Sequence, residues 1–284
     1  MKWLIELLTK LFSKKKPEVK PEVQDPSTNI DSSIIDIIET TATEADHNGL
    51  EDDGEDVTEI VNSTSSPEYK QYPNLCVCLD PGHGSDTPGK RSPYASNKKN
   101  LPALYFREYE FSREMVNRIK AELEKYGVEV FVTVTGEKDI LLTTRYKRAN
   151  SHKAKNPNKK YIFISVHANA AGNGQWMNAR GWSVWTTKGQ NYSDKLATCL
   201  YNVAEKILPA LNQKMRKDIS DGDPDYESNF TVIYGANMPA ILTENMFQDN
   251  VDDVKFLLSE EGKKALTEIH VKGILKFADE ILKM

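Results

Sequence analysis

The sequence predicts an α/β protein with a single, largely parallel twisted sheet that is flanked by helices on both faces. From Asn74 onward, short apolar runs alternate with stretches of helical periodicity, a pattern typical of parallel strands joined by helical crossovers. The mean hydropathy of the chain is only −0.57, and its polar residues are concentrated before residue 73. We therefore expect one ordered domain over 73–284.

The elements follow one another in the order of the chain. Residues 75–80 (LCVCLD) are a short apolar run that ends in a turn, as expected of a buried strand. Helical periodicity over 107–127 closes at Gly127, a residue type that often ends helices. Residues 128–134 (VEVFVTV) are rich in β-branched side chains and predict a second strand, and 142–154 predict the next helix.

The second half of the domain continues the alternation. Residues 161–168 (YIFISVHA) predict a buried strand, and 182–187 (WSVWTT) predict a further one. Apolar spacing over 193–208 predicts an amphipathic helix, and 240–245 (AILTEN) predicts a strand before a polar turn. From about Val254 to Met284 the periodicity is helical, with acids at the start and lysines near the end, which suits the helix dipole.

Residues 1–16 predict a short basic amphipathic helix, with apolar side chains on one face and lysines at 14–16. Glu6 and Lys10 interrupt the apolar run, which is too short to span a bilayer and precedes no small-residue cleavage site. We therefore see no convincing cleavable signal peptide. The helix would contact a membrane surface or a partner, or it would pack on its own domain.

Residues 17–72 predict a disordered acidic linker. They are rich in Pro, Ser, Thr, Asp and Glu, and they include the acidic run EDDGEDVTE. Such a segment cannot bury enough apolar surface to offset the entropy lost on ordering. Only 32–39 (SSIIDIIE) would form a transient helix or docking motif.

Net charge and cysteine content exclude two classes of protein. A formal net charge of −5 supplies no positive field for phosphates, so we expect no nucleic-acid partner. Cys76 and Cys78 lie two apart in a predicted strand, and Cys199 lies in a predicted helix. We therefore expect three buried thiols rather than a disulfide framework.

Three predicted strands end in groups that can bind a metal or move a proton: LCVCLDPGHGS, YIFISVHANA and AILTENMF. Ligands of open α/β sheets bind at the carboxyl ends of the strands, so we expect these ends to converge on one site. A single histidine there is often structural, but His83 and His167 both follow apolar strands and have small neighbours. The other histidines, His47, His152 and His270, lie in linker or helical segments.

Two imidazoles and one carboxylate leave a position open on zinc, as hydrolytic sites require. Glu108 and Glu110 both begin the first helix, but residues two apart point about 200° from each other. Glu108 is the better candidate because it lies on the apolar stripe with Phe111. Simple helix-terminus electrostatics is the alternative for either acid. Asp80, before the Pro-Gly turn, is a further candidate, as a ligand or as an orienting acceptor.

Glu244 ends an apolar strand, where burying a carboxylate is costly unless it has a partner or a role. A carboxylate beside a zinc-activated water can act as a general base and then protonate a leaving amine. The alternative role for Glu244 is a structural salt bridge.

The motifs LDPGHG, a Glu that opens a helix, SVHANA and a Glu in LTEN resemble the zinc-dependent N-acetylmuramoyl-L-alanine amidases of the type-3 class. These occur among bacterial cell-wall remodelling enzymes and phage endolysins. The resemblance covers about Leu75 to Leu282, and it is specific because four separated motifs occur in the family's order. It implies one Zn²⁺ per chain held by His83, Glu108 and His167, with Glu244 as the catalytic acid–base.

Residues 86–107 form a longer segment than the family pattern requires, and they resemble the TPGKRSP loop of a phage- and prophage-associated branch. This segment would line the substrate groove or form a surface insertion. GNGQWMNARGW and DPDYESNF resemble loops that flank the cleft in that branch. Trp176 and Tyr226 in these loops would stack on sugar or peptide, or simply pack.

The resemblance implies hydrolysis of the amide between the lactyl group of N-acetylmuramic acid and L-alanine in peptidoglycan. The alternatives are a zinc peptidase acting on stem or cross-link peptides, and a catalytically silent wall-binding module, against which Glu244 argues.

The substrate lies outside the cytoplasmic membrane. An endolysin would wait in the host cytoplasm before lysis, whereas a host enzyme would use the N-terminal helix as an uncleaved, membrane-associated segment. The oligomeric state stays open.

Overall fold

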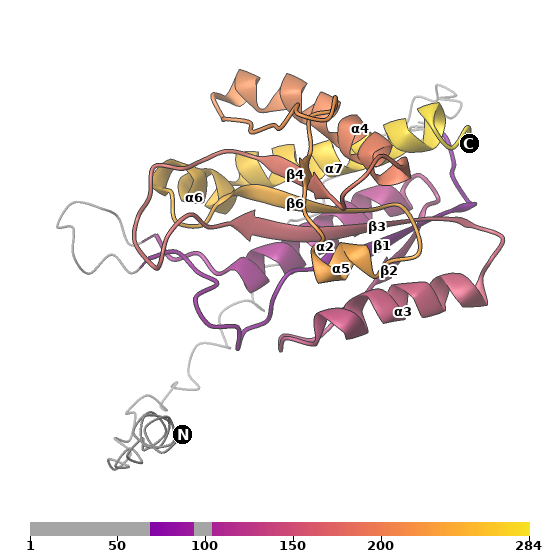
Figure 1. Cartoon of the computed structure of the whole chain (residues 1–284), viewed down its shortest axis with the longest axis horizontal. Coiled ribbons are helices and arrows are strands. Elements are labelled where there is room, and N and C mark those ends of the chain that lie inside the picture. Colours follow the sequence, from indigo (N-terminus) through magenta and orange to yellow (C-terminus); the bar gives the residue numbers. More distant parts are fainter. Residues whose placement is uncertain (1–68, 94–103) are drawn as a thin grey trace, which may run out of the picture. The chain divides into compact units, whose positions relative to one another are not determined.

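The computed structural model describes residues 69–93 and 104–284 (Figure 1). The predicted helix 1–16, the predicted linker up to residue 68, and residues 94–103 of the longer segment lie outside the described residues. The elements are β1 (Leu75–Pro81), α2 (Glu108–Glu124), β2 (Glu129–Val132), α3 (Leu142–Lys155), β3 (Lys160–Asn169), β4 (Ser183–Thr186), α4 (Tyr192–Ile207), η2 (Pro209–Leu211), β5 (Tyr226–Glu227), α5 (Thr231–Tyr234), β6 (Ala240–Phe247), α6 (Val251–Leu258) and α7 (Glu260–Glu280).

The described strands form one sheet of six in the order β2-β1-β3-β6-β4-β5. The pairs β1–β2, β1–β3 and β3–β6 are parallel, whereas β4 runs antiparallel to β6. A loop at 170–182 joins β3 to β4 without the crossover helix that a parallel connection needs. The predicted α/β fold with a largely parallel sheet is therefore confirmed, and the exceptions are β4 and β5, which run parallel to each other and opposite to the other four strands.

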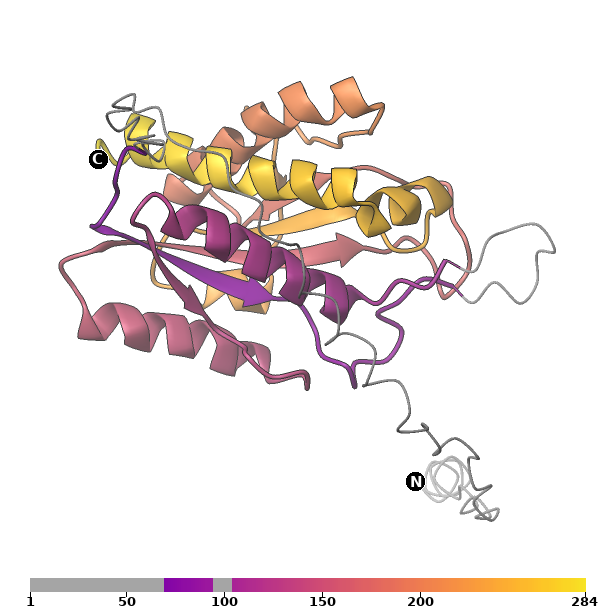
Figure 2. The ribbon, with the colours of Figure 1, turned by 180° about the vertical axis from the view of Figure 1, so that it is seen from behind.

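Helices cover both faces of the sheet, as predicted (Figures 1 and 2). Helices α2, α4 and α7 pack together on one face, and α3 and α5 lie on the other. Side chains alternate along β1: Val77 and Leu79 belong to the larger core, whereas Cys76 and Cys78 belong to the smaller one. The prediction of buried thiols is confirmed, because both cysteines and Cys199 are free and buried.

Two contacts fix α7 in its layer. A Cβ at Gly273 would lie 2.6 Å from the Leu200 side chain, so this glycine lets α7 approach α4 closely. Tyr72 is buried, and its hydroxyl donates to Asp279 Oδ1 at 3.0 Å. Tyr72 was assigned to the linker from the sequence, but it packs on the domain.

The helical periodicity predicted from Val254 to Met284 belongs to two helices rather than one. Ser259 separates α6 from α7 in an extended conformation (φ −78°, ψ 148°), and its side chain accepts from the Gly262 N–H. A serine whose side chain caps the first turn of a helix favours the beginning of a new helix at that point, here α7, over continuation of the preceding helix α6.

Candidate metal centre and active site

The carboxyl ends of β1, β3 and β6 bring the predicted site residues together. His83 follows β1, His167 lies near the end of β3, and Glu244 is directly opposite His167 in the β3–β6 register. The rings of His83 and His167 meet edge to face, with centroids 4.9 Å apart. The parallel order of the three strands places these side chains at one edge of the sheet, as expected for an α/β site.

Glu108, the first residue of α2, is the acid that faces the two histidines. Its side chain is 1% exposed, and its Oε1 lies 3.0 Å from His167 Nδ1 and 3.4 Å from His83 Nε2. The Ala168 N–H also donates to this oxygen. Glu110 points to solvent, with its side chain 53% exposed and 3.6 Å from Arg107. The structure thus groups Glu108, and not Glu110, with the histidines.

The loop that carries His83 is held by a buried arginine. His83 has φ 56°, in the left-handed region that side chains with a Cβ rarely adopt. Arg145 is 1% exposed, and its guanidinium donates to the carbonyls of Pro81 and His83 and to Asp80 Oδ1. Arg113 donates to the same His83 carbonyl from α2. These donors stabilise an otherwise unfavourable backbone.

Gly82 allows the His167 ring to lie against this loop. A Cβ at position 82 would lie 2.6 Å from the His167 ring atoms Cε1 and Nδ1, closer than side-chain atoms approach one another. The glycine in the GHG motif is therefore explained by close packing against the second histidine.

Asp80 orients His167 through a bridging serine. Ser165 Oγ donates to Asp80 Oδ2 at 2.7 Å and lies 3.1 Å from His167 Nε2. When Nε2 carries the proton, it donates to Ser165, and Nδ1 presents its lone pair beside Glu108. Asp80 itself is held by Thr133 and Arg145. The structure thus places Asp80 in the orienting position, one of the two roles left open for it.

The charges of the cluster depend on burial and on one another. Burial opposes a charged Glu108, but the hydrogen bond and charge of His167 outweigh it and lower the pKa of Glu108. Burial alone would lower the pKa of His167, yet Glu108 raises it. His83 has a pKa lowered to about 4, chiefly by burial. His83 is therefore a neutral imidazole at neutral pH, the form that binds metals.

Glu244 has no cationic partner among the described residues of the chain. Its Oε2 is shielded from water and has no hydrogen-bond partner among the described residues. Removal from water raises the pKa of Glu244 to about 7, an effect that His167 opposes and Glu108 reinforces. The structural salt bridge considered from the sequence is not formed, because no described cation pairs with this side chain. A carboxyl group with such a pKa suits proton transfer.

Asn245, the residue after Glu244, fixes β6 against β3. Its amide donates to the His167 carbonyl at 3.0 Å, and Trp182 Nε1 donates to its Oδ1 at 3.0 Å. Beside it, Thr243 Oγ1 lies 3.0 Å from His270 Nε2 of α7. These buried polar groups hold each other and so fix the strand that carries Glu244.

The two aromatic residues considered for substrate stacking are packed in the structure. Trp176 packs against the larger core from the loop after β3, and Tyr226 stacks on Trp185 with centroids 4.7 Å apart. The loop itself is held by Asp249, whose Oδ2 accepts from the backbone N–H groups of Ala171 and Gly172. The geometry therefore favours packing, the second of the two roles considered.

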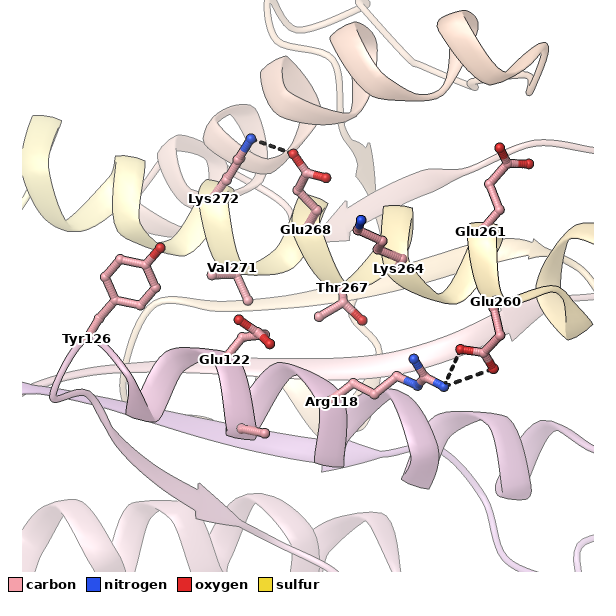
Figure 3. A pocket seen from close by; sticks show the side chains of 11 residues that line it. Arg118, Glu122, Tyr126, Glu260, Glu261, Lys264, Thr267, Glu268, Val271 and Lys272 are labelled. Carbon is pink, nitrogen blue, oxygen red and sulfur yellow. Dashed lines mark hydrogen bonds and ion pairs between the residues drawn. The ribbon is translucent and has the colours of Figure 1, made fainter. Parts of the chain in front are cut away.

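A groove of about 630 Å³ between α2 and α7 is separate from this cluster (Figure 3). Its walls carry charged side chains that pair across the helices or along them, such as Arg118 with Glu260 and Lys272 with Glu268. It contains none of the predicted site residues, which lie at the strand ends. The groove belongs to the helical layer, and we assign it no chemistry.

The cluster fits a metal on the chemistry of its donors. One ligand atom from each of His83, Glu108 and His167 lies within 4.8 Å of the other two. Glu108 Oε2 is buried without a partner among the described residues, which leaves a charged donor free. Two imidazoles and a carboxylate are a donor set of catalytic zinc sites.

The residues that sequence reasoning missed are Arg145, Ser165 and Asn245. An arginine in a helix carries no local signal of burial, because arginine is usually exposed. Ser165 lies within the predicted buried strand 161–168, so its burial was predictable, but its partners were not. Asn245 lies beside Glu244 in the motif LTEN, so its place next to a catalytic candidate was the available signal.

In the part of the chain that the structure describes, no helix is both long and apolar enough to cross a membrane.

Comparisons with known proteins agree with this geometry. Residues 77–276 match the family model described as N-acetylmuramoyl-L-alanine amidase. The endolysin of Bacillus phage SPP1 is 29% identical over 201 residues, which cover 70% of this chain and 64% of that protein. The amidase AmiC of Neisseria meningitidis is 26% identical, with 71% and 52% covered. The chain thus spans between about half and two thirds of these curated relatives.

Solved structures share the fold. The N-acetylmuramoyl-L-alanine amidase from Clostridium difficile 630 is 25% identical with a TM-score of 0.60, over 74% of this chain and all of that one. The catalytic domain of CwlV from Paenibacillus polymyxa is 24% identical with a TM-score of 0.55, over 72% and 98%. The chain belongs to the N-acetylmuramoyl-L-alanine amidase family, and the resemblance drawn from the motifs is confirmed.

Proposed function

We propose that this member of the N-acetylmuramoyl-L-alanine amidase family hydrolyses the amide bond between N-acetylmuramic acid and L-alanine in peptidoglycan. The observation that carries the proposal is buried Glu108 between His83 and His167, with Glu244 opposite His167 at the carboxyl ends of parallel strands. The family match over 77–276 supports the reaction and the substrate.

His83, Glu108 and His167 would hold one zinc ion per chain. When bound, the zinc would polarise the scissile carbonyl and make water a stronger nucleophile at neutral pH. Asp80 and Ser165 keep His167 in the orientation in which Nδ1 faces Glu108, and Arg145 keeps His83 in its left-handed backbone conformation.

Glu244 would move the proton. It accepts a proton from the attacking water while the water oxygen bonds to the lactyl carbonyl carbon. When the carbon–nitrogen bond breaks, Glu244 returns that proton to the alanine nitrogen, so the products are a lactyl carboxyl group and a stem peptide with a free amino terminus. The raised pKa of Glu244 suits both transfers.

The proposal extends to location and domain organisation. The domain 73–284, with Tyr72 packed on it, would act on the cell wall outside the cytoplasmic membrane, and the acidic segment that starts at residue 17 and lies outside the described residues up to residue 68 would serve as a tether. The basic helix 1–16, which lies outside the described residues, would contact a membrane surface. The enzyme would reach the wall either from the host cytoplasm at lysis or from a membrane-associated position.

The test is mass spectrometry of purified peptidoglycan digested by wild type and by Glu244→Gln, with the zinc content of both proteins measured. We expect stem peptides that begin with L-alanine from wild type, and a rate lower by about 10²–10⁴-fold in Glu244→Gln. Both proteins should hold about one zinc ion. Glu137→Gln, an exposed acid in a neighbouring loop, is the control and should behave as wild type.

Three results would overturn the proposal. Products cut within the stem would make the protein a peptidase. Bound zinc without any product from wild type would make it a binding module. Unchanged turnover in Glu244→Gln would remove Glu244 from the acid–base role.

A further inference from the structure

Three aspartates form a second cluster, away from the candidate metal centre. Asp194 lies in the first turn of α4, and Asp223 and Asp225 lie in the loop before β5. One carboxylate oxygen of each lies within 4.8 Å of the other two. Asp194 is 3% exposed and Asp225 is 1% exposed, so two of the three acids are removed from water.

Each aspartate uses one oxygen to hold the protein and leaves the other without a partner. Asp194 Oδ2 accepts from the Asn191 N–H, Asp223 Oδ2 accepts from Gln190 at 2.8 Å, and Asp225 Oδ2 accepts from the Thr186 hydroxyl. The Oδ1 atom of all three is buried and has no hydrogen-bond partner among residues 69–93 and 104–284. Asp223 and Asp225 can share one proton, but Asp194 Oδ1 still has no partner among the described residues. Buried polar atoms rarely stay unsatisfied, so the group indicates a missing ligand.

Among residues 69–93 and 104–284, no lysine or arginine forms an ion pair with these three carboxylates. Burial, followed by the neighbouring Asp223, raises the pKa of Asp225 to about 8, which shows how unfavourable a second charge is there. Lysine and arginine supply none of the hydrogen bonds to these three carboxylates. A positive ion among the acids would remove this repulsion.

Carboxylates alone select hard cations. An all-oxygen donor set with flexible geometry suits Ca²⁺, whereas zinc prefers sites that include nitrogen or sulfur. The sequence places acids at alternate positions, Asp221, Asp223 and Asp225, the spacing with which calcium loops present their first ligands. Asp221 lies outside the three-residue group, and Tyr226 stands where such loops have glycine, so this loop is not an EF-hand.

The cluster lies at the other end of the sheet from Glu244. Ser183 of β4 is opposite Glu244, and Thr186, which donates to Asp225, lies three residues further along β4. That separation is roughly 10 Å along the strand. The α4 end of the cluster adjoins the start of β6, where the Ala240 N–H donates to Ser193.

We propose that Asp194, Asp223 and Asp225 form a calcium site that joins the loop before β5 to the start of α4. The ion would join the first turn of α4 to the loop 221–225, and Thr186, which donates to Asp225, would connect this loop to the end of β4. It would stabilise the β4–β5 edge of the sheet, where β5 is only two residues long.

The test is thermal unfolding of the full, zinc-loaded chain with and without added CaCl₂, together with calorimetric titration of the same protein with CaCl₂. At about 100-fold excess over Kd we expect the melting temperature to rise by roughly 5–10 °C. Asp225→Asn keeps an acceptor for Thr186 but cannot provide the carboxylate charge that would bind calcium. It should melt no lower than wild type without calcium and should lose the calcium response.

Asp218→Asn is the matched control, because it makes the same change in the same loop, and asparagine retains an acceptor for the Ser220 N–H. It should keep the wild-type calcium response. The absence of both a shift and binding heat in wild type would overturn the proposal. An equal calcium response in Asp225→Asn would place the ion elsewhere, and an equal response to MgCl₂ would overturn the assignment to calcium.

Discussion

The two clusters of buried acids lie at opposite ends of the same sheet and differ in their donors. At the carboxyl ends of β1, β3 and β6, Glu108 is joined by two imidazoles. At the far end of β4, Asp194, Asp223 and Asp225 form a group of three carboxylates that includes no imidazole. Both clusters leave carboxylate oxygens without partners, and both residue sets come from segments far apart in the chain.

The difference shows that an unsatisfied carboxylate indicates a ligand, whereas its neighbours indicate which ligand. Nitrogen donors held rigidly by Arg145 and Ser165 suit zinc and hydrolysis. An oxygen-only group, formed by the first turn of α4 and the loop before β5, suits calcium and stabilisation. The fold provides the first at the edge where open α/β sheets bind ligands, and the second beside a short edge strand.

The largest expected effect separates the two acids at the start of α2. Glu108→Gln should lose the bound zinc and lower amidase activity by at least the ~10²–10⁴-fold that loss of one acid–base group costs. Its matched control, Glu110→Gln, removes an exposed acid two residues away. Zinc content and the rate of peptidoglycan hydrolysis are the measurements.

Glu110→Gln should keep both zinc and activity. Zinc retained by Glu108→Gln and lost from Glu110→Gln would show that Glu110, and not Glu108, is the metal ligand. Loss of the calcium response in Glu108→Gln would show that the two ends of the sheet are not independent.

An intermediate effect is expected for the pH dependence of stability, through His270, a buried side chain whose ring nitrogens both have partners. Burial lowers the pKa of His270 to about 4, and Nδ1 donates to the Leu266 carbonyl. An unfolded histidine binds protons below about pH 6.5, and the folded one does not until about pH 4. The folded state should therefore be fully stabilised above pH 6.5 and lose about 3 kcal/mol of unfolding free energy as the pH falls toward 4.

Urea unfolding at several pH values measures this effect. In His270→Gln, the unfolding free energy should no longer fall by this amount between pH 6.5 and 4. The control His152→Gln replaces a partly exposed histidine and should keep the wild-type pH dependence. Identical slopes in wild type and His270→Gln would show that His270 does not titrate in this way. The slope should be independent of calcium, since His270 is not part of the aspartate cluster.

The smallest expected effect concerns the hydrogen bond that orients His167. It compares a serine at the zinc end of the sheet with a serine at the other end. Ser165→Ala should weaken zinc binding about 10–100-fold, because His167 loses the hydroxyl that orients it. Ser193→Ala removes another buried serine, near the aspartate cluster, and should leave zinc affinity unchanged. Competition with a chelator of known affinity measures both, and equal affinities would remove the orienting role of Ser165.

Much of the fold and the first site was predictable from local patterns. The alternation of strands and helices, the buried thiols and the position of Glu108 follow from periodicities of two and 3.6 residues along the chain. The antiparallel direction of β4 was not predictable from its own residues, because a short apolar strand carries no directional signal. The break at Ser259 was likewise hidden within continuous helical periodicity.

The sequence by itself determined which segments become strands and helices, and which chemical groups stand at their ends. Only the tertiary structure decided that Arg145 would bind Asp80, 65 residues away, that Ser165 would bridge Asp80 and His167, and that three aspartates would meet. The physical reason is that periodicity reports which face of an element is buried. The partner of a buried polar group depends on how distant segments pack, and neither its identity nor its distance is encoded locally.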